Sequence, residues 1–150
     1  MTSPGRCEVI HREPTVILDA AHNPHGARAL AETLESEFTF DEIVGVFGVF
    51  ADKDVDGILQ ALEPVINSLI VTSSSSPRAM SVDDLERIAK KIFGGDRVIK
   101  VERLEDALAR AMSDARRPSA VNSVGVVVTG SVVTVGEARA IVKRIAGSEE

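Results

Sequence analysis

The chain has 150 residues, enough to bury the core of one domain. Hydrophobic residues make up 44% of it and charged residues 27%, a balance typical of globular proteins rather than disordered ones. The net charge of −6 and the aromatic content of 3% argue against a nucleic-acid partner, which would require a basic surface or stacking rings.

The chain shows no sign of an oxidising or membrane environment. Its single cysteine, Cys7, cannot form an internal disulfide. The first twelve residues lack the apolar core of a signal peptide, and no apolar run approaches the roughly 18 residues that span a bilayer. We therefore expect a cytoplasmic protein without a membrane partner.

Short apolar runs alternate with amphipathic stretches along the chain. The runs are rich in β-branched residues and predict strands buried on both faces of a parallel sheet, at 15–18, 43–47, 68–71, 98–101 and 124–128. Apolar residues at helical spacing predict helices at 27–34, 58–65, 85–92, 104–112 and 135–145. Residues 6–11 form either an antiparallel edge strand paired with 15–19 or an extended arm. The expected fold class is α/β: a Rossmann-like, doubly wound, mostly parallel sheet of five to six strands with helices on both faces.

The most informative loop follows the first apolar run, because open α/β sheets bind ligands beyond the carboxyl ends of their strands. Asp19 closes that run, Asn23 is a favoured helix N-cap, and Pro24 suits the first helical position. Backbone N–H groups at this helix start would face an anion, with His22 beside them. The alternative is a well-capped turn in which Asp19 and His22 are simply solvated.

Two further loops carry candidate ligand groups. Lys53 stands between two aspartates in the loop 48–54, where it could meet a phosphate or carboxylate. Its alternative role is in an ion-paired helix start capped by Asp54. Ser131 follows Gly130 and offers a hydroxyl either to a ligand or to the cap of a tight turn.

Several common motifs are missing from the sequence. His22 and His25 stand three residues apart without a nearby third ligand, so we expect no metal site here. No glycine directly precedes a lysine, as a Walker A loop requires, and no G-x-G dinucleotide fingerprint occurs. If this domain handles a nucleotide, another domain must hold the phosphates.

Five short segments, in order, resemble the C-terminal domain of folylpolyglutamate synthase/dihydrofolate synthase, a family of the Mur ligase superfamily. The resemblance covers Pro4 to about Val142, and one departure is Ala20, where the family commonly has glycine. The segments are Pro4-Gly5-Arg6, residues 18–24 (Leu-Asp-Ala-Ala-His-Asn-Pro), Asp52-Lys53-Asp54, Thr129-Gly130-Ser131 and Val135-Gly136-Glu137.

This resemblance implies an ATP-dependent ligase that adds glutamate to dihydropteroate or to folates. In that family ATP phosphorylates the acceptor carboxylate, and the amine of glutamate attacks the acyl phosphate. The P-loop, the Mg²⁺ ligands and most of the pterin site belong to an N-terminal domain. Residues 1–150 would then be the C-terminal domain of a larger two-domain enzyme, would close over ATP, and would be inactive alone.

The resemblance also implies roles for five residues. Arg6 matches the arginine that contacts ATP phosphate, and Asp19 the aspartate that binds the nucleotide. A carboxylate repels phosphate, so Asp19 suits ribose hydroxyls or the adenine amine. His22 and Ser131 match positions around the glutamate and the reacting phosphate, which makes His22 a candidate catalytic residue, with Lys53 as a looser one.

Two other functions remain open at this point. The chain could belong to a sister ligase that acts on peptidoglycan precursors, polyglutamate or cyanophycin. It could also be a non-catalytic, flavodoxin-like interaction module. A receiver-type module would need an acidic pair near the first strand, whereas Asp19 stands alone, and an aspartate ending the third, whereas 68–71 is followed by Thr72.

Overall fold

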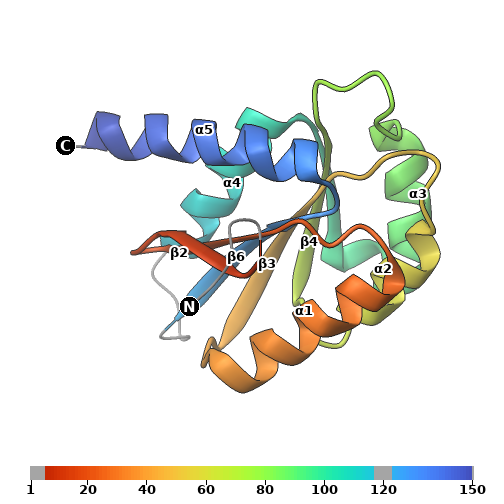
Figure 1. Ribbon diagram of the computed structural model, residues 1–150, viewed down its shortest axis with the longest axis horizontal. Helices are drawn as coiled ribbons and strands as arrows, with labels where there is room; N and C mark the ends of the chain where they lie inside the picture. Colours follow the sequence, from red (N-terminus) through yellow and green to blue (C-terminus); the bar gives the residue numbers. More distant parts are fainter. Residues whose placement is uncertain (1–5, 117–122, 150) are drawn as a thin grey trace.

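The computed structural model describes residues 6–116 and 123–149. Within them, six strands form one sheet in the order β1-β2-β6-β3-β4-β5 (Figure 1). The strands are β1 Glu8–His11, β2 Thr15–Asp19, β3 Glu42–Phe47, β4 Ser68–Ser73, β5 Val98–Arg103 and β6 Val124–Thr129. The helices are α1 Pro24–Glu37, α2 Val55–Leu62, α3 Val82–Phe93, α4 Leu104–Arg116 and α5 Val132–Glu149, with a 3₁₀ turn, η1, at Gly95–Arg97.

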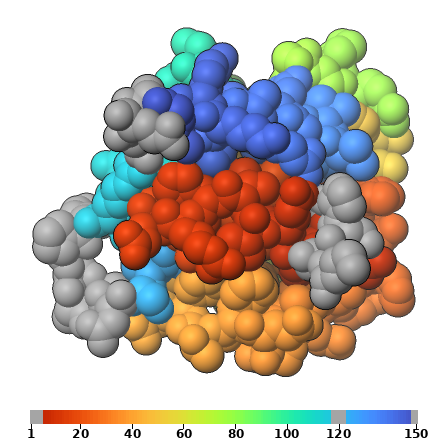
Figure 2. Space-filling model, turned by 60° about the vertical axis from the view of Figure 1, so that its left-hand side comes forward, coloured from red at the N-terminus to blue at the C-terminus, as the bar shows by residue number. Residues whose placement is uncertain are grey.

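The strands pair as a mostly parallel sheet, which confirms the expected fold class. Five strands run parallel to one another, in the order β2, β6, β3, β4 and β5. Strand β1 pairs antiparallel with β2, joining Glu8 to Leu18 and Val9 to Ile17, so residues 8–11 are the edge strand rather than an arm. Figure 2 shows this red hairpin lying between α5 and α1 on the surface.

Helices cover both faces of the sheet because successive strand side chains point to opposite sides. Ile17 and Val127 pack on the face covered by α1, α2 and α3. Val16 and Val126 pack on the other face, under α4 and α5. None of the helices in the described part of the chain combines the length and apolarity that crossing a bilayer demands.

Local signals in the sequence place the helix ends. Asn23, Asp54 and Ser81 each accept a hydrogen bond from a backbone N–H three residues on, so α1, α2 and α3 begin where capping residues stand. Helix α3 ends at Phe93 and is followed by the C-cap residue Gly94, whose φ of 91° suits glycine. Helix α2 ends at Leu62, before Pro64. The predicted helix, which extended to residue 65, was therefore about one turn too long at this end.

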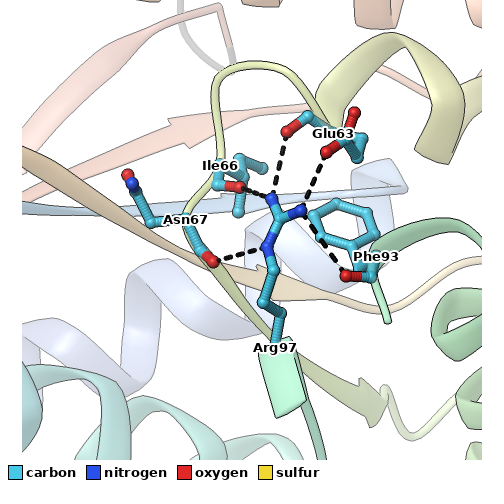
Figure 3. A network of polar contacts seen from close by, with 5 residues as sticks. All are labelled: Glu63, Ile66, Asn67, Phe93 and Arg97. Atoms are coloured by element: carbon cyan, nitrogen blue, oxygen red, sulfur yellow. Dashed lines mark hydrogen bonds and ion pairs between the residues drawn. The ribbon is translucent and has the colours of Figure 1, made fainter. Parts of the chain in front are cut away.

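An arginine clamp joins the connection between α2 and β4 to the connection between α3 and β5 (Figure 3). The Arg97 guanidinium donates to the carbonyl oxygens of Glu63, Ile66 and Asn67 at 2.7–3.2 Å. It also pairs with the Glu63 carboxylate at 2.8 Å and lies 4.9 Å from the centre of the Phe93 ring. One side chain therefore satisfies the carbonyl group at the C-cap of α2 and two more in the connection that follows it.

Replacing Arg97 by alanine should destabilise the fold by about 2–3 kcal/mol, because several charge-assisted hydrogen bonds are lost together. Urea unfolding followed by circular dichroism measures the change. Arg87→Ala is the control: its pair with Asp84 is exposed, so its loss should cost under about 0.5 kcal/mol. Equal stability of the two variants would show that the clamp contributes nothing.

Candidate functional site

The loops singled out in the sequence leave the sheet at one edge. Asp19, Thr129 and Phe47 lie side by side at the carboxyl ends of β2, β6 and β3, and Val71 is next to Phe47 on β4. The loops that follow these strands therefore begin within a few strand spacings of one another. This is the edge at which open α/β sheets bind ligands.

A cavity of about 670 Å³ extends from this edge along helix α1, between α1 and the start of β1. Arg6, Asp19 and His22 all line it, so the structure brings together three of the five predicted site residues. Pro4 and Gly5, which precede Arg6 in the motif, lie outside the described residues. The volume is in the range of small-molecule sites. The wall also includes Cys7, Val9, Ala20, Ala21, Asn23, Gly26, Ala29, Leu30, Thr33, Glu37 and Phe38.

Asp19 is a buried carboxylate whose two oxygens both bind the chain itself. Its Oδ2 accepts the backbone N–H of Cys7 at 3.0 Å and lies 3.5 Å from the Cys7 thiol. Its Oδ1 accepts the backbone N–H of Ala21 at 2.9 Å. The side chain that closes β2 thus fixes both the entry to β1 and the turn into α1.

Cys7 also belongs to the cavity wall, a position that the sequence analysis did not predict for it. It is buried, with a backbone φ of 45° in the left-handed region. Burial and the charge of Asp19 raise the pKa of the thiol to about 12. The thiol therefore stays protonated at neutral pH and is no nucleophile. In the sequence, only the position of Cys7 next to Arg6 indicates that it lies at the site.

His22 lies at the start of α1 with an exposed ring. Its Nδ1 is 3.1 Å from the carbonyl oxygen of Ala20, which favours the tautomer that donates from Nδ1. Asn23 caps the helix by accepting the N–H of Gly26 at 2.7 Å. An imidazole beside a helix N-terminus is well placed to meet an anion.

Ser131 lies outside the cavity wall and acts as a cap. Its Oγ accepts the backbone N–H of Thr134 and donates to the Thr134 hydroxyl, both at 2.9 Å. The Thr134 hydroxyl in turn donates to the Gly48 carbonyl oxygen at 3.0 Å. The structure therefore shows the capping arrangement that the sequence left open, in a buried chain of hydrogen bonds.

Lys53 also lies at the carboxyl edge but outside the cavity wall. It follows Asp52, which pairs with Arg78 at 3.5 Å, and precedes Asp54, which caps α2. Backbone bonds from Met80 to Val49 and from Ala51 to Arg78 brace its loop against the loop after β4. These bonds hold the loop that carries Lys53 in place. The Lys53 ammonium does not line the cavity that Arg6 lines.

The chemistry of the cavity suits a phosphorylated ligand. A guanidinium, an imidazole and a helix N-terminus are all groups that bind phosphate oxygens. A divalent metal fits less well, because residues 6–116 and 123–149 contain no group of three or more histidine, cysteine or carboxylate side chains placed to hold one.

Comparisons with known proteins identify relatives of this chain. The family profile described as Mur ligase, glutamate ligase domain matches residues 5–132. Dihydrofolate synthase/folylpolyglutamate synthase from Mycobacterium tuberculosis is 51% identical over 152 residues, covering 96% of this chain and 31% of the relative. The M. tuberculosis folylpolyglutamate synthase solved with ADP and AMPPCP superposes with a TM-score of 0.88 at 53% identity, over 94% of this chain and 32% of the other.

Solved structures with lower sequence identity share the same fold. Escherichia coli FolC, solved with DHPP and ADP, has a TM-score of 0.79 at 26% identity, over 99% of this chain and 32% of its own. The Yersinia pestis folylpolyglutamate synthase/dihydrofolate synthase, solved with AMPPNP and a Mn ion, has a TM-score of 0.73 at 28% identity, over 95% of this chain and 32% of its own. The chain spans about a third of the length of these relatives, and it belongs to the Mur ligase glutamate ligase domain family.

Proposed function

We propose that this chain is the C-terminal domain of a cytoplasmic, ATP-dependent ligase that adds glutamate to dihydropteroate, to folates or to both through an acyl phosphate. The observation that carries the proposal is the convergence of Arg6, Asp19 and His22 on one cavity at the carboxyl edge of the sheet. The 51% identity to the mycobacterial synthase supports the choice of substrates.

The residues of the cavity have distinct tasks in this proposal. Arg6 donates to phosphate oxygens, because a guanidinium offers paired N–H donors to a tetrahedral anion. Asp19 belongs to the nucleotide site. His22, beside the capped start of α1, binds glutamate or the reacting phosphate and can hold a proton there. When bound, ATP supplies the phosphoryl group that turns a carboxylate oxygen into a leaving group.

Lys53 and Ser131 have different places in this proposal from the cavity residues. Both lie at the carboxyl edge but outside the cavity wall, and Ser131 already caps α5. We propose that Lys53 reaches the reacting groups only when a second domain closes over this edge, and that Ser131 borders the glutamate site. Closure of this kind excludes water from a reactive acyl phosphate.

We propose Mg²⁺ as the metal of the reaction, with its ligands and a P-loop in a preceding domain. The match of this chain to only about a third of each relative supports a further domain. In this proposal, residues 6–116 and 123–149 provide no ligand to the metal.

An activity assay on two proteins tests the function. The 150-residue chain and the full-length enzyme that contains it are each incubated with ATP, MgCl₂, glutamate and one acceptor: dihydropteroate, tetrahydrofolate or a UDP-muramoyl substrate. Mass spectrometry detects the product and a coupled assay detects ADP. We expect glutamate addition to one or both pterins by the full-length enzyme and none by the chain alone. Turnover by the chain alone, or exclusive use of the UDP-muramoyl substrate, would refute the proposal.

A further inference from the structure

Two lysine or arginine side chains stand in the loops that leave the carboxyl ends of β2, β6, β3 and β4. They are Lys53, in the loop after β3, and Arg78, in the loop after β4. Strands β3 and β4 are neighbours in the sheet, so the two loops begin side by side. Because open α/β sheets bind ligands at this edge, Arg78 is a second candidate partner for an anionic substrate.

Backbone hydrogen bonds join the loops that carry these two cations. The carbonyl oxygen of Arg78 accepts the N–H of Ala51 at 3.0 Å, and the N–H of Met80 donates to the carbonyl oxygen of Val49 at 2.8 Å. Residues 49–51 and 78–80 therefore pair as a short antiparallel bridge. The backbone itself fixes where Arg78 lies relative to the loop of Lys53.

Phe50 supports both cations. The guanidinium carbon of Arg78 lies 4.4 Å from the centre of the Phe50 ring, within the range of cation–π contacts. The carbonyl oxygen of Phe50 accepts the N–H of Lys53 at 3.2 Å. A long side chain loses rotamer freedom when it binds a ligand, so stacking that already restrains the guanidinium lowers the cost of binding an anion.

The stacked guanidinium keeps most of its N–H donors for a ligand. Among residues 6–116 and 123–149, its polar contact is with Asp52 at 3.5 Å, longer than the roughly 2.7–2.9 Å of a strong charge-assisted bond. Both of these side chains are 63% exposed, so water weakens the pair further. The Arg97 guanidinium, by contrast, binds three carbonyl groups and a carboxylate at 2.7–3.2 Å. Arg97 is thus part of the fold, whereas Arg78 presents its donors at the surface.

The substrate that the proposed reaction brings to this edge is a dicarboxylate. The amine of glutamate attacks the acyl phosphate, so both carboxylates of glutamate stay ionised and each needs a partner. Four carbon–carbon bonds of about 1.5 Å each join these carboxylates, and neighbouring strands are about 4.8 Å apart. The loops after β3 and β4 are therefore spaced to engage one carboxylate each.

We propose that Arg78 binds the side-chain carboxylate of the incoming glutamate, while Lys53 faces the α-carboxylate next to the reacting amine. The strand order supports this assignment, because β4 lies farther than β3 from β2, whose end lines the cavity. Arg78 is then the residue that distinguishes glutamate from amino acids without a second carboxylate. This inference rests on the proposed function, since it takes glutamate as the substrate.

Steady-state kinetics of the full-length enzyme test the inference, with ATP, MgCl₂ and the accepted pterin in excess. The amine donors are glutamate, its side-chain amide glutamine and its α-amide isoglutamine, and mass spectrometry measures the products. Arg78→Ala should lower kcat/KM for glutamate and isoglutamine about tenfold to a hundredfold, because a hydrogen-bonded charge pair is lost. It should change kcat/KM for glutamine by less than about twofold, since glutamine has no side-chain charge. Equal losses for glutamate and glutamine, or a loss for glutamine but none for isoglutamine, would overturn the proposal.

Two further variants show whether the position of the charge matters. Phe50→Leu keeps an apolar side chain but removes the ring face, and should raise KM for glutamate about twofold to fivefold with kcat unchanged. Arg103→Ala is the matched control, because Arg103 ends β5, is 71% exposed and lies 4.0 Å from Asp106. It should change kcat/KM for glutamate by less than about twofold. A loss as large as that of Arg78→Ala would show that only net charge matters, and the proposal would be wrong.

The wild-type enzyme separates failure of this inference from failure of the proposed function. If the wild type adds glutamate and Arg78→Ala does so with the same kcat/KM, the inference fails and the proposed function stands. If the wild type adds glutamate to no acceptor, the proposed function fails and this inference fails with it. Arg78→Ala should melt within about 2 °C of wild type, because its side chain is exposed. A clearly lower melting temperature would assign Arg78 to the fold rather than to the substrate, against the proposal.

Discussion

Replacing Gly130 by alanine is expected to destabilise the fold by about 3 kcal/mol or more. A Cβ on this residue would lie 2.0 Å from the Gly48 carbonyl oxygen, a backbone atom that cannot rotate away. The backbone φ of 122° adds strain for any residue with a side chain. Overpacking alone costs about 1–3 kcal/mol, and an unfavourable φ about 1–3 kcal/mol more.

The control for Gly130 is six residues away in helix α5. A Cβ on Gly136 would meet nothing within 4 Å, and the residue is exposed inside a helix. Gly136→Ala should therefore stabilise the chain by about 0.5–1 kcal/mol. Thermal and urea unfolding measure both variants, with a shift of about 2–4 °C per kcal/mol for a chain of this size. A Gly130→Ala variant as stable as wild type would mean that the segments directly after β3 and β6 do not approach this closely.

Loss of the Arg6 side chain should reduce ligation far more than it reduces stability. Arg6 is exposed and lines the cavity, so Arg6→Ala removes few packing contacts. A charged donor to a transferring phosphoryl group is worth about 2.7–4 kcal/mol, and its loss lowers kcat about a hundredfold to a thousandfold. We expect a fall of that size in kcat/KM for ATP in the full-length enzyme, which we propose is a ligase, with the melting temperature within about 2 °C of wild type.

Two further variants distinguish a contact with phosphate from a general effect of charge. Arg6→Lys keeps the charge but loses the paired donors, and should recover only part of the activity. Arg28→Ala removes the same charge from the exposed side of α1, outside the cavity wall, and should change kcat/KM by less than twofold. An equal fall in kcat/KM for Arg6→Ala and Arg28→Ala would show that Arg6 acts only through its charge and not through a contact with phosphate.

The local features of the fold follow from local patterns in the chain. Runs such as 124–128 predicted the buried strands, because β-branched residues at consecutive positions suit a sheet covered on both faces. Asn23 and Ser81 marked helix starts, because a short polar side chain can cap the N–H groups of its own helix. The place of Asp19 and His22 at the carboxyl edge was also predictable, because both follow the end of the first apolar run. The place of Arg6 beside them depends on the antiparallel pairing of β1 with β2, which the sequence left open.

Other features depend on contacts between distant parts of the chain, and only the tertiary structure decided them. Strand β6 lies between β2 and β3, so Thr129 is the neighbour of Asp19 despite a separation of 110 residues. The clamp made by Arg97 and the bonds from Cys7 to Asp19 likewise join groups that no local pattern brings together. Hydrophobic periodicity and helix capping act within a few residues and can be read along the chain. Strand order and buried polar pairing depend on which surfaces meet when the layers pack, and that is a property of the whole fold.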